Sequence, residues 1–309
     1  MRALSLVLLL SLSGGTACGA EDETVPGESL PLATQTAAAG ASCFSACNGN
    51  YISCLERSTS PLGQFVCGIN RHDCFDSCGL QDDLPPIPQT RYYGVGSGAG
   101  DNSSDVFTFV HGSGVASSFQ KLGESGRLLT DIAAHPGTGT LYASDVFGGL
   151  YSLDASTGAA TLVMHTPGVN ALDFCGGYNS LYAWGGSTLY LIDIGSLTWS
   201  TVGDVGFNSS GDLACSLWGT LYGLGEESSN TALIRINRRT GAGTWMGSLN
   251  WPDVYGMEID QSDRPIGAVS YGTAILLLGI HPTTGAASIV NSIQTTSGMN
   301  GLTTHNVAY

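Results

Sequence analysis

Side chains that can bind a metal ion recur at one position of a repeat in the second half of the chain. The position lies six residues before the first apolar residue of the predicted second strand in each copy. His135, Cys175, Cys215 and Asp260 occupy it, and His305 takes the matching place in the last copy. Imidazole, thiolate and carboxylate groups are the ligands that zinc uses in proteins. We therefore consider His135, Asp260 and His305 as candidate metal ligands, with Cys175 as a further one.

Two other interpretations of this position compete with the metal site. In the first, Cys175 and Cys215 form a disulfide between adjacent inner strands, which requires Cα atoms within about 7 Å of each other. In the second, the histidines and Asp260 cap strand ends, and the two cysteines are small core residues. The register of the third copy is open by one residue, because an alternative alignment places Ser216 instead of Cys215 in the ring.

A second set of residues with catalytic potential lies near the starts of the first strands: Asp131, Asp173, Asp212 and Glu258. A glycosidase needs two carboxyl groups beside the scissile bond, so a hydrolase with carboxylates at a channel mouth is one hypothesis. Carboxylates at such positions more often accept hydrogen bonds from backbone N–H groups. The sequence contains no Gly-x-Ser-x-Gly elbow, no His-Glu-x-x-His motif and no phosphate-binding loop. We accordingly predict no catalytic residue and no cofactor.

Short strands with a period of about 40 to 45 residues must position these side chains. Four complete copies begin near residues 129, 169, 211 and 255, and each holds four strand-sized runs, as one propeller blade does. Residues 91–95, 106–110 and 117–120 match the second, third and fourth strands of a blade, and residues 300–305 match a first strand. A blade shared between the ends would close the ring and remove its exposed edges. We predict a mainly β protein with a five-bladed β-propeller over residues 91–309.

Two of the turns between these strands carry a recurring motif. Residues 154–158 and 238–245 resemble the Asp-x-x-Thr-Gly-x-x-x-Trp pattern of quinoprotein-type blades. The tryptophan is present only as Trp245, and Leu162 replaces it in the first complete copy. The resemblance implies a secreted bacterial propeller, but it does not imply a bound quinone. We interpret the motif as a hairpin turn with glycine at a positive φ.

Six cysteines with mirror-symmetric spacing precede the repeats. They are separated by 3, 6, 12, 6 and 3 residues, which places each half on one face of a helix and lets one fold-back near Pro61 set the halves opposite each other. We predict two antiparallel helices, residues 42–57 and 62–78, in a stapled α-helical hairpin over residues 41–79. The predicted disulfides are Cys43–Cys78, Cys47–Cys74 and Cys54–Cys67. The hairpin resembles the twin Cys-x3-Cys hairpins of several small disulfide-rich families, which implies no activity; a zinc site that adds His72 is the alternative.

The N-terminus has the features of a secretory signal. Residues 1–17 combine one positive charge with a short apolar run. Residues 13–19 resemble a bacterial lipobox, which implies a lipid on Cys18. By the same resemblance, Gly19 after the cysteine implies a location in the outer membrane. Gly15 stands where that family usually has leucine, so ordinary cleavage after Ala17 or Ala20 is the alternative. Lipidation would leave eight of the nine cysteines, an even number suited to an oxidising compartment. We expect an anchor and disordered acidic tether over residues 18–40 and a proline-rich linker over residues 80–90.

Charge and aromatic content limit the ligands. The 309-residue chain has a net charge of −15, and Lys121 is its only lysine. Nucleic acids and anionic membrane surfaces are therefore poor partners, because both bind through Lys and Arg. Five tryptophans are candidates for stacking on sugars or peptides, or for packing between blades: Trp184, Trp199, Trp218, Trp245 and Trp251.

These features predict a non-enzymatic binding platform in the cell envelope, either an outer-membrane lipoprotein or a secreted protein. We expect a protein or a neutral glycan as its ligand at one face of the propeller. The N-terminal lipid would be its sole membrane attachment. The alternatives are a glycan-active hydrolase with carboxylates at the channel mouth and a structural envelope component without a small ligand.

Overall fold

The computed structural model describes residues 90–97, 102–112, 118–261, 263–295 and 297–305. The chain divides into two units, Met1–Pro85 and Pro86–Tyr309. The predicted signal, Cys18, the tether, the six-cysteine hairpin and the linker before residue 90 lie outside the described residues. Within them there is no helix, and so none that could cross a bilayer.

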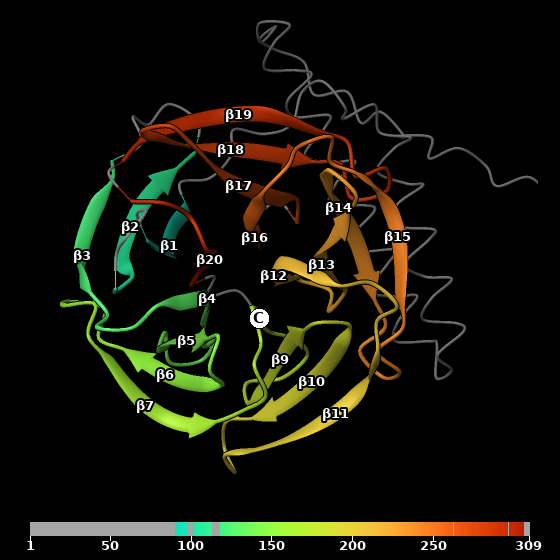
Figure 1. Ribbon diagram of the computed structural model, residues 1–309, viewed down its shortest axis with the longest axis horizontal. Coiled ribbons are helices and arrows are strands. Elements are labelled where there is room, and N and C mark those ends of the chain that lie inside the picture. The colour runs from blue at the N-terminus through green and yellow to red at the C-terminus, as the bar shows by residue number, and fades with distance from the viewer. Residues whose placement is uncertain (1–89, 98–101, 113–117, 262, 296, 306–309) are drawn as a thin grey trace, which may run out of the picture. The chain divides into compact units, whose positions relative to one another are not determined.

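Five four-stranded antiparallel sheets are arranged in a ring, with their innermost strands at its centre (Figure 1). We call the space that these innermost strands enclose the channel. Four of these blades consist of consecutive strands. The second blade contains β4 (Leu129–Ala134), β5 (Leu141–Asp145), β6 (Gly149–Leu153) and β7 (Ala160–His165). The third contains β8 (Ala171–Phe174), β9 (Ser180–Gly185), β10 (Thr188–Asp193) and β11 (Thr198–Asp204). The fourth contains β12 (Ser209–Cys215), β13 (Leu221–Glu227), β14 (Asn230–Ile236) and β15 (Gly243–Ser248), and the fifth contains β16 (Val254–Ile259), β17 (Pro265–Tyr271), β18 (Ala274–Ile280) and β19 (Ala287–Gln294).

The first blade is shared between the two ends of the propeller. Its innermost strand is β20 (Gly301–Thr304), and its other strands are β1 (Thr90–Gly96), β2 (Asp105–His111) and β3 (Gln120–Glu124). Thr303 pairs with Tyr93 in the β20–β1 ladder. The predicted five-bladed ring and its composite blade are therefore confirmed.

The last strand of the composite blade differs from the sequence prediction. It runs over residues 120–124 instead of 117–120. Phe119, which the sequence prediction included in the strand, precedes it and packs its ring on Phe107 with centroids 5.1 Å apart. The strand itself carries Lys121 and Glu124 on its solvent-exposed edge.

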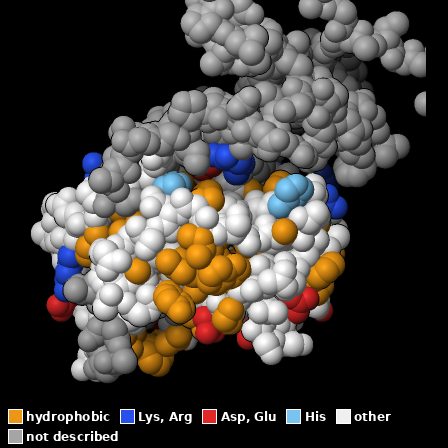
Figure 2. Space-filling model, turned by 90° about the horizontal axis from the view of Figure 1, so that it is seen from above, with side chains coloured by type: hydrophobic (Ala, Val, Ile, Leu, Met, Phe, Trp, Pro, Cys, Tyr) orange, Lys and Arg blue, Asp and Glu red, His pale blue; other side chains and the backbone are white. Residues whose placement is uncertain are grey.

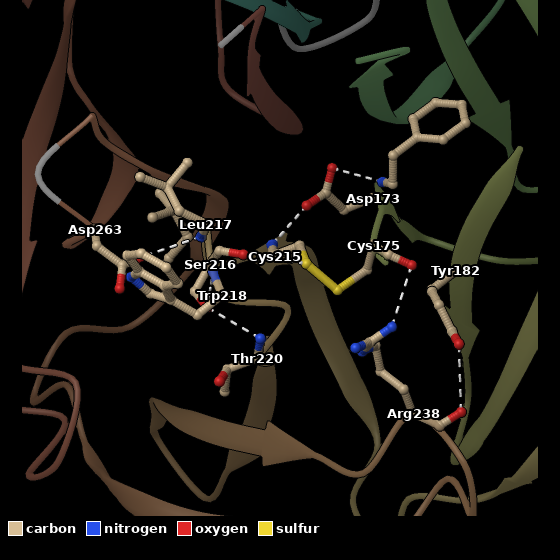
Figure 3. Close-up of a disulfide and its surroundings, with 12 residues drawn as sticks. Asp173, Cys175, Tyr182, Cys215, Ser216, Leu217, Trp218, Thr220, Arg238 and Asp263 are labelled. Atoms are coloured by element: carbon tan, nitrogen blue, oxygen red, sulfur yellow. Dashed lines mark hydrogen bonds between the residues drawn. A yellow bond between two sulfur atoms is a disulfide. The ribbon is translucent and has the colours of Figure 1, made fainter. Parts of the chain in front are cut away.

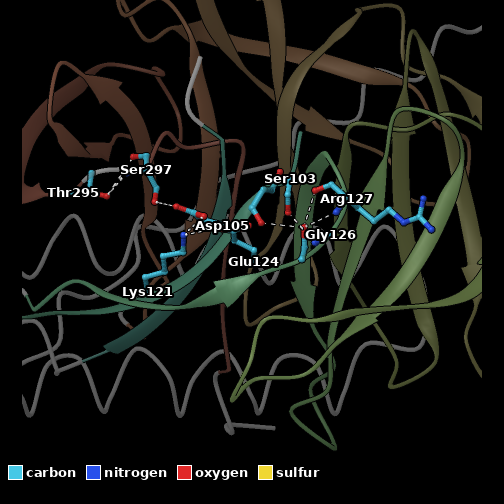
Figure 4. A network of polar contacts seen from close by, with 10 residues as sticks. Ser103, Asp105, Lys121, Glu124, Gly126, Arg127, Thr295 and Ser297 are labelled. Atoms are coloured by element: carbon cyan, nitrogen blue, oxygen red, sulfur yellow. Dashed lines mark hydrogen bonds and ion pairs between the residues drawn. The ribbon is translucent and has the colours of Figure 1, made fainter. Parts of the chain in front are cut away.

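A polar network joins the composite blade to the segment between β19 and β20 (Figure 4). Lys121 Nζ lies 2.7 Å from Asp105 Oδ1 and 3.2 Å from Glu124 Oε1. The Ser297 hydroxyl donates a hydrogen bond to Asp105 Oδ2 at 2.5 Å. Asp105 therefore connects β2 to the chain segment that leads into the closing strand.

Hydrophobic clusters fill the spaces between neighbouring blades. The cluster around Trp184 draws Tyr182 and Leu189 from the third blade and Leu213 and Ile234 from the fourth. Trp184 is fully buried, whereas Trp199, Trp218 and Trp245 are 41 to 50% exposed, so blade packing accounts for only the first of these tryptophans. Figure 2 shows the ring edge-on from the side of β19, with hydrophobic side chains gathered near the middle of this view.

The Thr-Gly turns between third and fourth strands are structural, as their motif predicts. Asp154 and Asn237 accept hydrogen bonds from backbone N–H groups two and three residues further on, and Asp193 does the same in the third blade, whose turn has no Thr-Gly pair. Turns of this kind also pack against the outer strand of the preceding blade at a glycine. A Cβ on Gly247 would lie 1.7 Å from the Thr284 carbonyl oxygen, so only glycine permits this contact.

Candidate functional site

The innermost strands β4, β8, β12, β16 and β20 contribute residues to an opening at each end of the channel. We call the opening where these strands begin the strand-start mouth, and the opening where they end the strand-end mouth. At the strand-end mouth, each innermost strand is followed by the turn that leads into the second strand of its blade. The sequence-predicted metal ring lies at this end, whereas the predicted carboxylates lie within the channel.

Five side chains inside the channel bond each blade to the next, and we call them the inner belt. In each case a side-chain oxygen accepts a hydrogen bond from a backbone N–H of the following innermost strand, whose channel edge has no neighbouring strand. Asp131 accepts from Leu172 at 2.5 Å, Asp173 from Cys215 at 2.6 Å, Asp212 from Met257 at 2.8 Å, Glu258 from Thr304 at 2.8 Å and Thr303 from Ala134 at 3.0 Å.

The belt carboxyl groups retain protons more strongly than exposed ones. Burial raises the pKa of Asp131, Asp173 and Asp212 well above the usual range for aspartate, and it raises the pKa of Glu258 to about 7. No ion pair among the described residues includes one of them. Asp131 and Asp212 are within hydrogen-bond reach of each other, and Asp212 Oδ1 has no other partner in the described part of the chain. A proton held by Asp212 and donated to Asp131 makes this contact favourable.

A small cavity opens at the strand-end mouth. Asp173, Glu258 and Thr304 line it together with apolar residues, and its volume is about 30 Å³. This volume corresponds to about one water molecule. Asp173 and Glu258 are 8 and 7% exposed, so two carboxyl groups with raised pKa reach this cavity, although a sugar ring does not fit.

The predicted metal-binding position instead caps the turns into the second strands. His135 Nδ1 accepts hydrogen bonds from the N–H groups of Gly137 and Thr138, both at 3.1 Å. Asp260 Oδ1 accepts from the Arg264 N–H at 3.0 Å, and its Oδ2 pairs with the Arg264 guanidinium at 2.9 Å. Both side chains therefore stabilise local backbone.

The register of the third copy is settled by the backbone. The N–H of Ser216 bonds to Thr220 O, in the same way that the N–H of Cys175 bonds to Ser180 O. Ser216 therefore occupies the position that we had assigned to Cys215. Its hydroxyl caps the turn by accepting from the Thr220 N–H at 3.0 Å.

The last predicted ligand, His305, packs its ring against Gly139 in the turn after β4. Among the residues that the structure describes, no three His, Cys, Asp or Glu side chains form a group suited to a metal ion. The structure thus does not gather His135, Asp260 and His305 into a metal centre.

Cys175 and Cys215 form a disulfide between the third and fourth blades, with Cα atoms 5.4 Å apart, as one of the sequence interpretations predicted (Figure 3). Arg238 lies beside it and donates a hydrogen bond to Cys175 O at 3.4 Å. The Cys215 N–H is bonded to Asp173, so the disulfide and the inner belt connect the same two strands.

The strand-start mouth was not predicted from the sequence. Innermost strands bulge just before the belt level, where extra residues interrupt the ladder. In β4, Leu129 pairs with Asp145 and Asp131 with Ser144, which leaves Thr130 as the extra residue. Bulges redirect side chains and are common next to functional sites. The corresponding residues in the other blades are Asn170, Ser210 with Gly211, Tyr255 and Asn300.

Thr130 and these corresponding residues line a hollow of about 250 Å³. None of the side chains that line it is charged. Asn170 donates its amide group to Ser209 O at 3.3 Å, and Asn300 donates to Leu129 O at 2.9 Å. The sequence signal for this site is a polar residue between a buried apolar residue and a small residue, as in residues 169–171 and 299–301.

Comparison with known proteins gives the fold alone. No family model matches the chain, and no curated protein matches it. A chain from the crystal structure of a nidogen/laminin complex is similar with a TM-score of 0.51 and 8% identity, over 72% of this chain and 100% of that one. TolB from Acinetobacter baumannii has a TM-score of 0.46 and 13% identity over 81% and 74% of the two chains. A gluconolactonase from Xanthomonas campestris has a TM-score of 0.45 and 12% identity over 69% and 78%.

Proposed function

We propose that this protein is a non-enzymatic binding platform of the cell envelope, which holds a neutral glycan or a protein at one face of the propeller. The observation that carries the proposal is the contrast between the two ends of the channel. The strand-start mouth is an uncharged polar hollow of about 250 Å³. The strand-end mouth has a cavity of about 30 Å³, and its carboxyl groups, like the other acidic side chains of the channel, accept backbone hydrogen bonds.

Electrostatics supports a neutral ligand. The chain carries a net charge of −15, so an anionic ligand would approach against the overall field. A cationic ligand would need a carboxylate in the binding surface, and the lining of the strand-start mouth has none. Neutral hydroxyl or amide groups match its lining best, because they exchange hydrogen bonds with serine and asparagine side chains.

The N-terminal part of the proposal concerns location. A lipid on Cys18 would attach the protein to the outer membrane, the segment over residues 18–40 would act as a tether, and the stapled hairpin would be a spacer. Cleavage without lipidation would give a secreted protein with the same propeller. The oxidising compartment common to both cases is supported by the disulfide between Cys175 and Cys215.

The test combines binding with turnover on the full mature chain. Neutral oligosaccharides are titrated by calorimetry and then analysed for cleavage by mass spectrometry, and intact cells are cross-linked to recover a protein partner. We expect saturable binding of one ligand class without any product. The absence of both glycan binding and a cross-linked partner above background would overturn the platform and favour the structural envelope component.

A glycan-active hydrolase is the second candidate, and one observation favours it. Glu258, with its pKa raised to about 7, and Asp173 line the same small cavity, which is the type of carboxyl pair that acid–base catalysis uses. Product formation that Glu258→Gln abolishes, while thermal unfolding shows the variant folded, would support the hydrolase over the platform. We expect no product from either the native chain or this variant.

A further inference from the structure

We propose that the strand-start mouth binds a single neutral sugar ring, stacked on Tyr255 and hydrogen-bonded by Asn170 and Asn300. This inference rests on the proposed binding function and identifies the ligand class and the residues. All three residues line the hollow, and they come from the third, fifth and first blades. A ligand on the channel axis would therefore be contacted from several sides.

The two asparagines are oriented as hydrogen-bond acceptors. Asn170 Nδ2 donates to Ser209 O at 3.3 Å, and Asn300 Nδ2 donates to Leu129 O at 2.9 Å and to Ser97 Oγ at 3.4 Å. With the amide nitrogens held by the protein, the Oδ1 atoms are the groups that remain to face a ligand. Amide oxygens accept from hydroxyl groups, which a sugar supplies in number.

Tyr255 offers an aromatic surface at the rim. Its side chain is 39% exposed, and its hydroxyl donates to Asp253 Oδ1 at 3.0 Å, which limits the motion of the ring. Gly211 of the neighbouring blade lies against the backbone of Tyr255, where a Cβ would be 2.8 Å from Tyr255 O, and it contributes no side chain to the hollow beside the tyrosine. An aromatic ring held beside an open space is suited to the apolar C–H face of a sugar.

Ser210 supplies a further hydroxyl. It lines the hollow, and its Oγ has no hydrogen-bond partner among the described residues. An unsatisfied hydroxyl is unfavourable in a protein interior. Rotation about the Cα–Cβ bond would turn this hydroxyl toward a ligand, so that a bound sugar would satisfy a group that the protein leaves unpaired.

The lining argues against other small ligands. Phosphates and carboxylates need N–H donors or cations, and the two asparagines present acceptors instead. Pockets for drug-sized molecules have volumes of roughly 300–1,000 Å³, so this hollow is suited to one ring, with further residues of a glycan outside it. A peptide side chain of similar size would use fewer of the acceptors.

The experiment uses the full mature chain and a panel of neutral methyl glycosides and N-acetylhexosamines, with binding measured by calorimetry and ligand-detected NMR. Tyr255→Ala and Asn170→Ala should each weaken the affinity of the bound sugar by about tenfold, which is the effect of losing one good contact. Tyr255→Phe keeps the stacking surface and should stay within about threefold of the native chain. Tyr271→Ala removes an exposed tyrosine that does not line the hollow and should change nothing.

The outcomes separate this inference from the proposed function. Sugar binding that tolerates Tyr255→Ala and Asn170→Ala would place the ligand elsewhere and overturn the inference, while the platform would stand. Failure of every neutral sugar to bind, together with a cross-linked protein partner, would have the same consequence. If no neutral sugar binds and no protein partner is recovered, the inference and the platform are overturned together. If Tyr255→Ala does not fold, the inference is judged by the sugar affinity of Asn170→Ala compared with that of the control Tyr271→Ala.

Discussion

Glu258 Oε2 accepts a hydrogen bond from the backbone N–H of Thr304 at 2.8 Å and thereby joins the fifth blade to the strand that closes the ring. The same oxygen accepts from the Thr303 hydroxyl at 3.2 Å, and Thr303 in turn accepts from Ala134 of the second blade. The closing strand is therefore held by side chains on both sides as well as by its ladder to β1. These contacts make the inner belt a device that stabilises the ring through buried carboxyl groups.

We predict that mild acidification stabilises the propeller. The native state holds protons on the belt carboxyl groups that the unfolded chain has released, so the stability that these groups contribute is full below their unfolded pKa of about 4 and is lost as the pH rises through the native pKa, which for Glu258 is about 7. The contribution of Glu258 alone is on the order of 3 kcal/mol. His111, whose pKa is lowered by burial, opposes this trend below about pH 6.5.

Thermal unfolding of the native chain and of Glu258→Gln between pH 5 and 8 tests this prediction. The glutamine cannot ionise, so we expect a smaller change in Tm across this interval in the variant, whatever its absolute stability. Equal slopes for the two proteins would show that Glu258 has an ordinary pKa in the folded state.

A second prediction concerns Asp173 as a backbone cap. Its two oxygens accept from Phe174 N at 2.7 Å and Cys215 N at 2.6 Å. An asparagine side chain has only one acceptor oxygen, so Asp173→Asn leaves one buried N–H unsatisfied and should lower the free energy of unfolding by about 1–3 kcal/mol. Denaturant unfolding measures this loss. Glu226→Gln, at an exposed carboxylate, is the control and should change stability by less than about 0.5 kcal/mol.

The blade count and the composite blade were predictable because apolar alternation and turn residues recur with one period. The identity of the belt was only partly predictable. Asp131 and Asp212 stand at one level of the channel and Asp173 and Glu258 at another, as their ladder partners show. The sequence places all four near strand starts, but it does not reveal which backbone N–H each side chain reaches on the next blade.

The bulges explain most of what was missed. A bulge reverses the alternation of side chains, so a pattern with period two does not tell where Thr130 or Tyr255 points. The turn after β12 is one residue shorter than the turns after β4 and β8, since Ser216 N bonds to Thr220 O whereas Cys175 N bonds to Ser180 O, and this is why Cys215 and Ser216 were ambiguous. Fixing these positions required the hydrogen-bond register of the ladders.

A third prediction concerns the glycine contact between blades. A Cβ on Gly247 would lie 1.7 Å from Thr284 O, a backbone atom that cannot move without displacing the turn. We expect Gly247→Ala to lower the free energy of unfolding by about 1–3 kcal/mol. Gly177→Ala is a matched control, because its Cβ would meet only the Ser180 side chain, whose hydroxyl lies 3.2 Å away. Similar losses in the two variants would contradict the proposed role of the contact.

A fourth prediction concerns the disulfide between the third and fourth blades. Cys175 and Cys215 are 40 residues apart in sequence, so their bond restricts a large loop of the unfolded chain. We expect the double variant Cys175→Ala with Cys215→Ala to lose about 2–4 kcal/mol of stability in denaturant unfolding. The double variant is preferable to a reductant, which would also act on the predicted N-terminal disulfides. Unchanged stability would mean that the blades hold this geometry without the bond.

The last prediction concerns the cysteines of the N-terminal unit. Because Cys175 and Cys215 pair with each other, seven cysteines remain in the chain, an odd number. A lipid on Cys18 leaves six, which the mirror spacing pairs as Cys43–Cys78, Cys47–Cys74 and Cys54–Cys67. Non-reducing digestion and mass spectrometry should recover these three pairs and a diacylated N-terminus. Cys18→Ser should lose the lipid and the membrane association while keeping all four disulfides. A free thiol among the six, or zinc released by a chelator, would contradict the stapled hairpin.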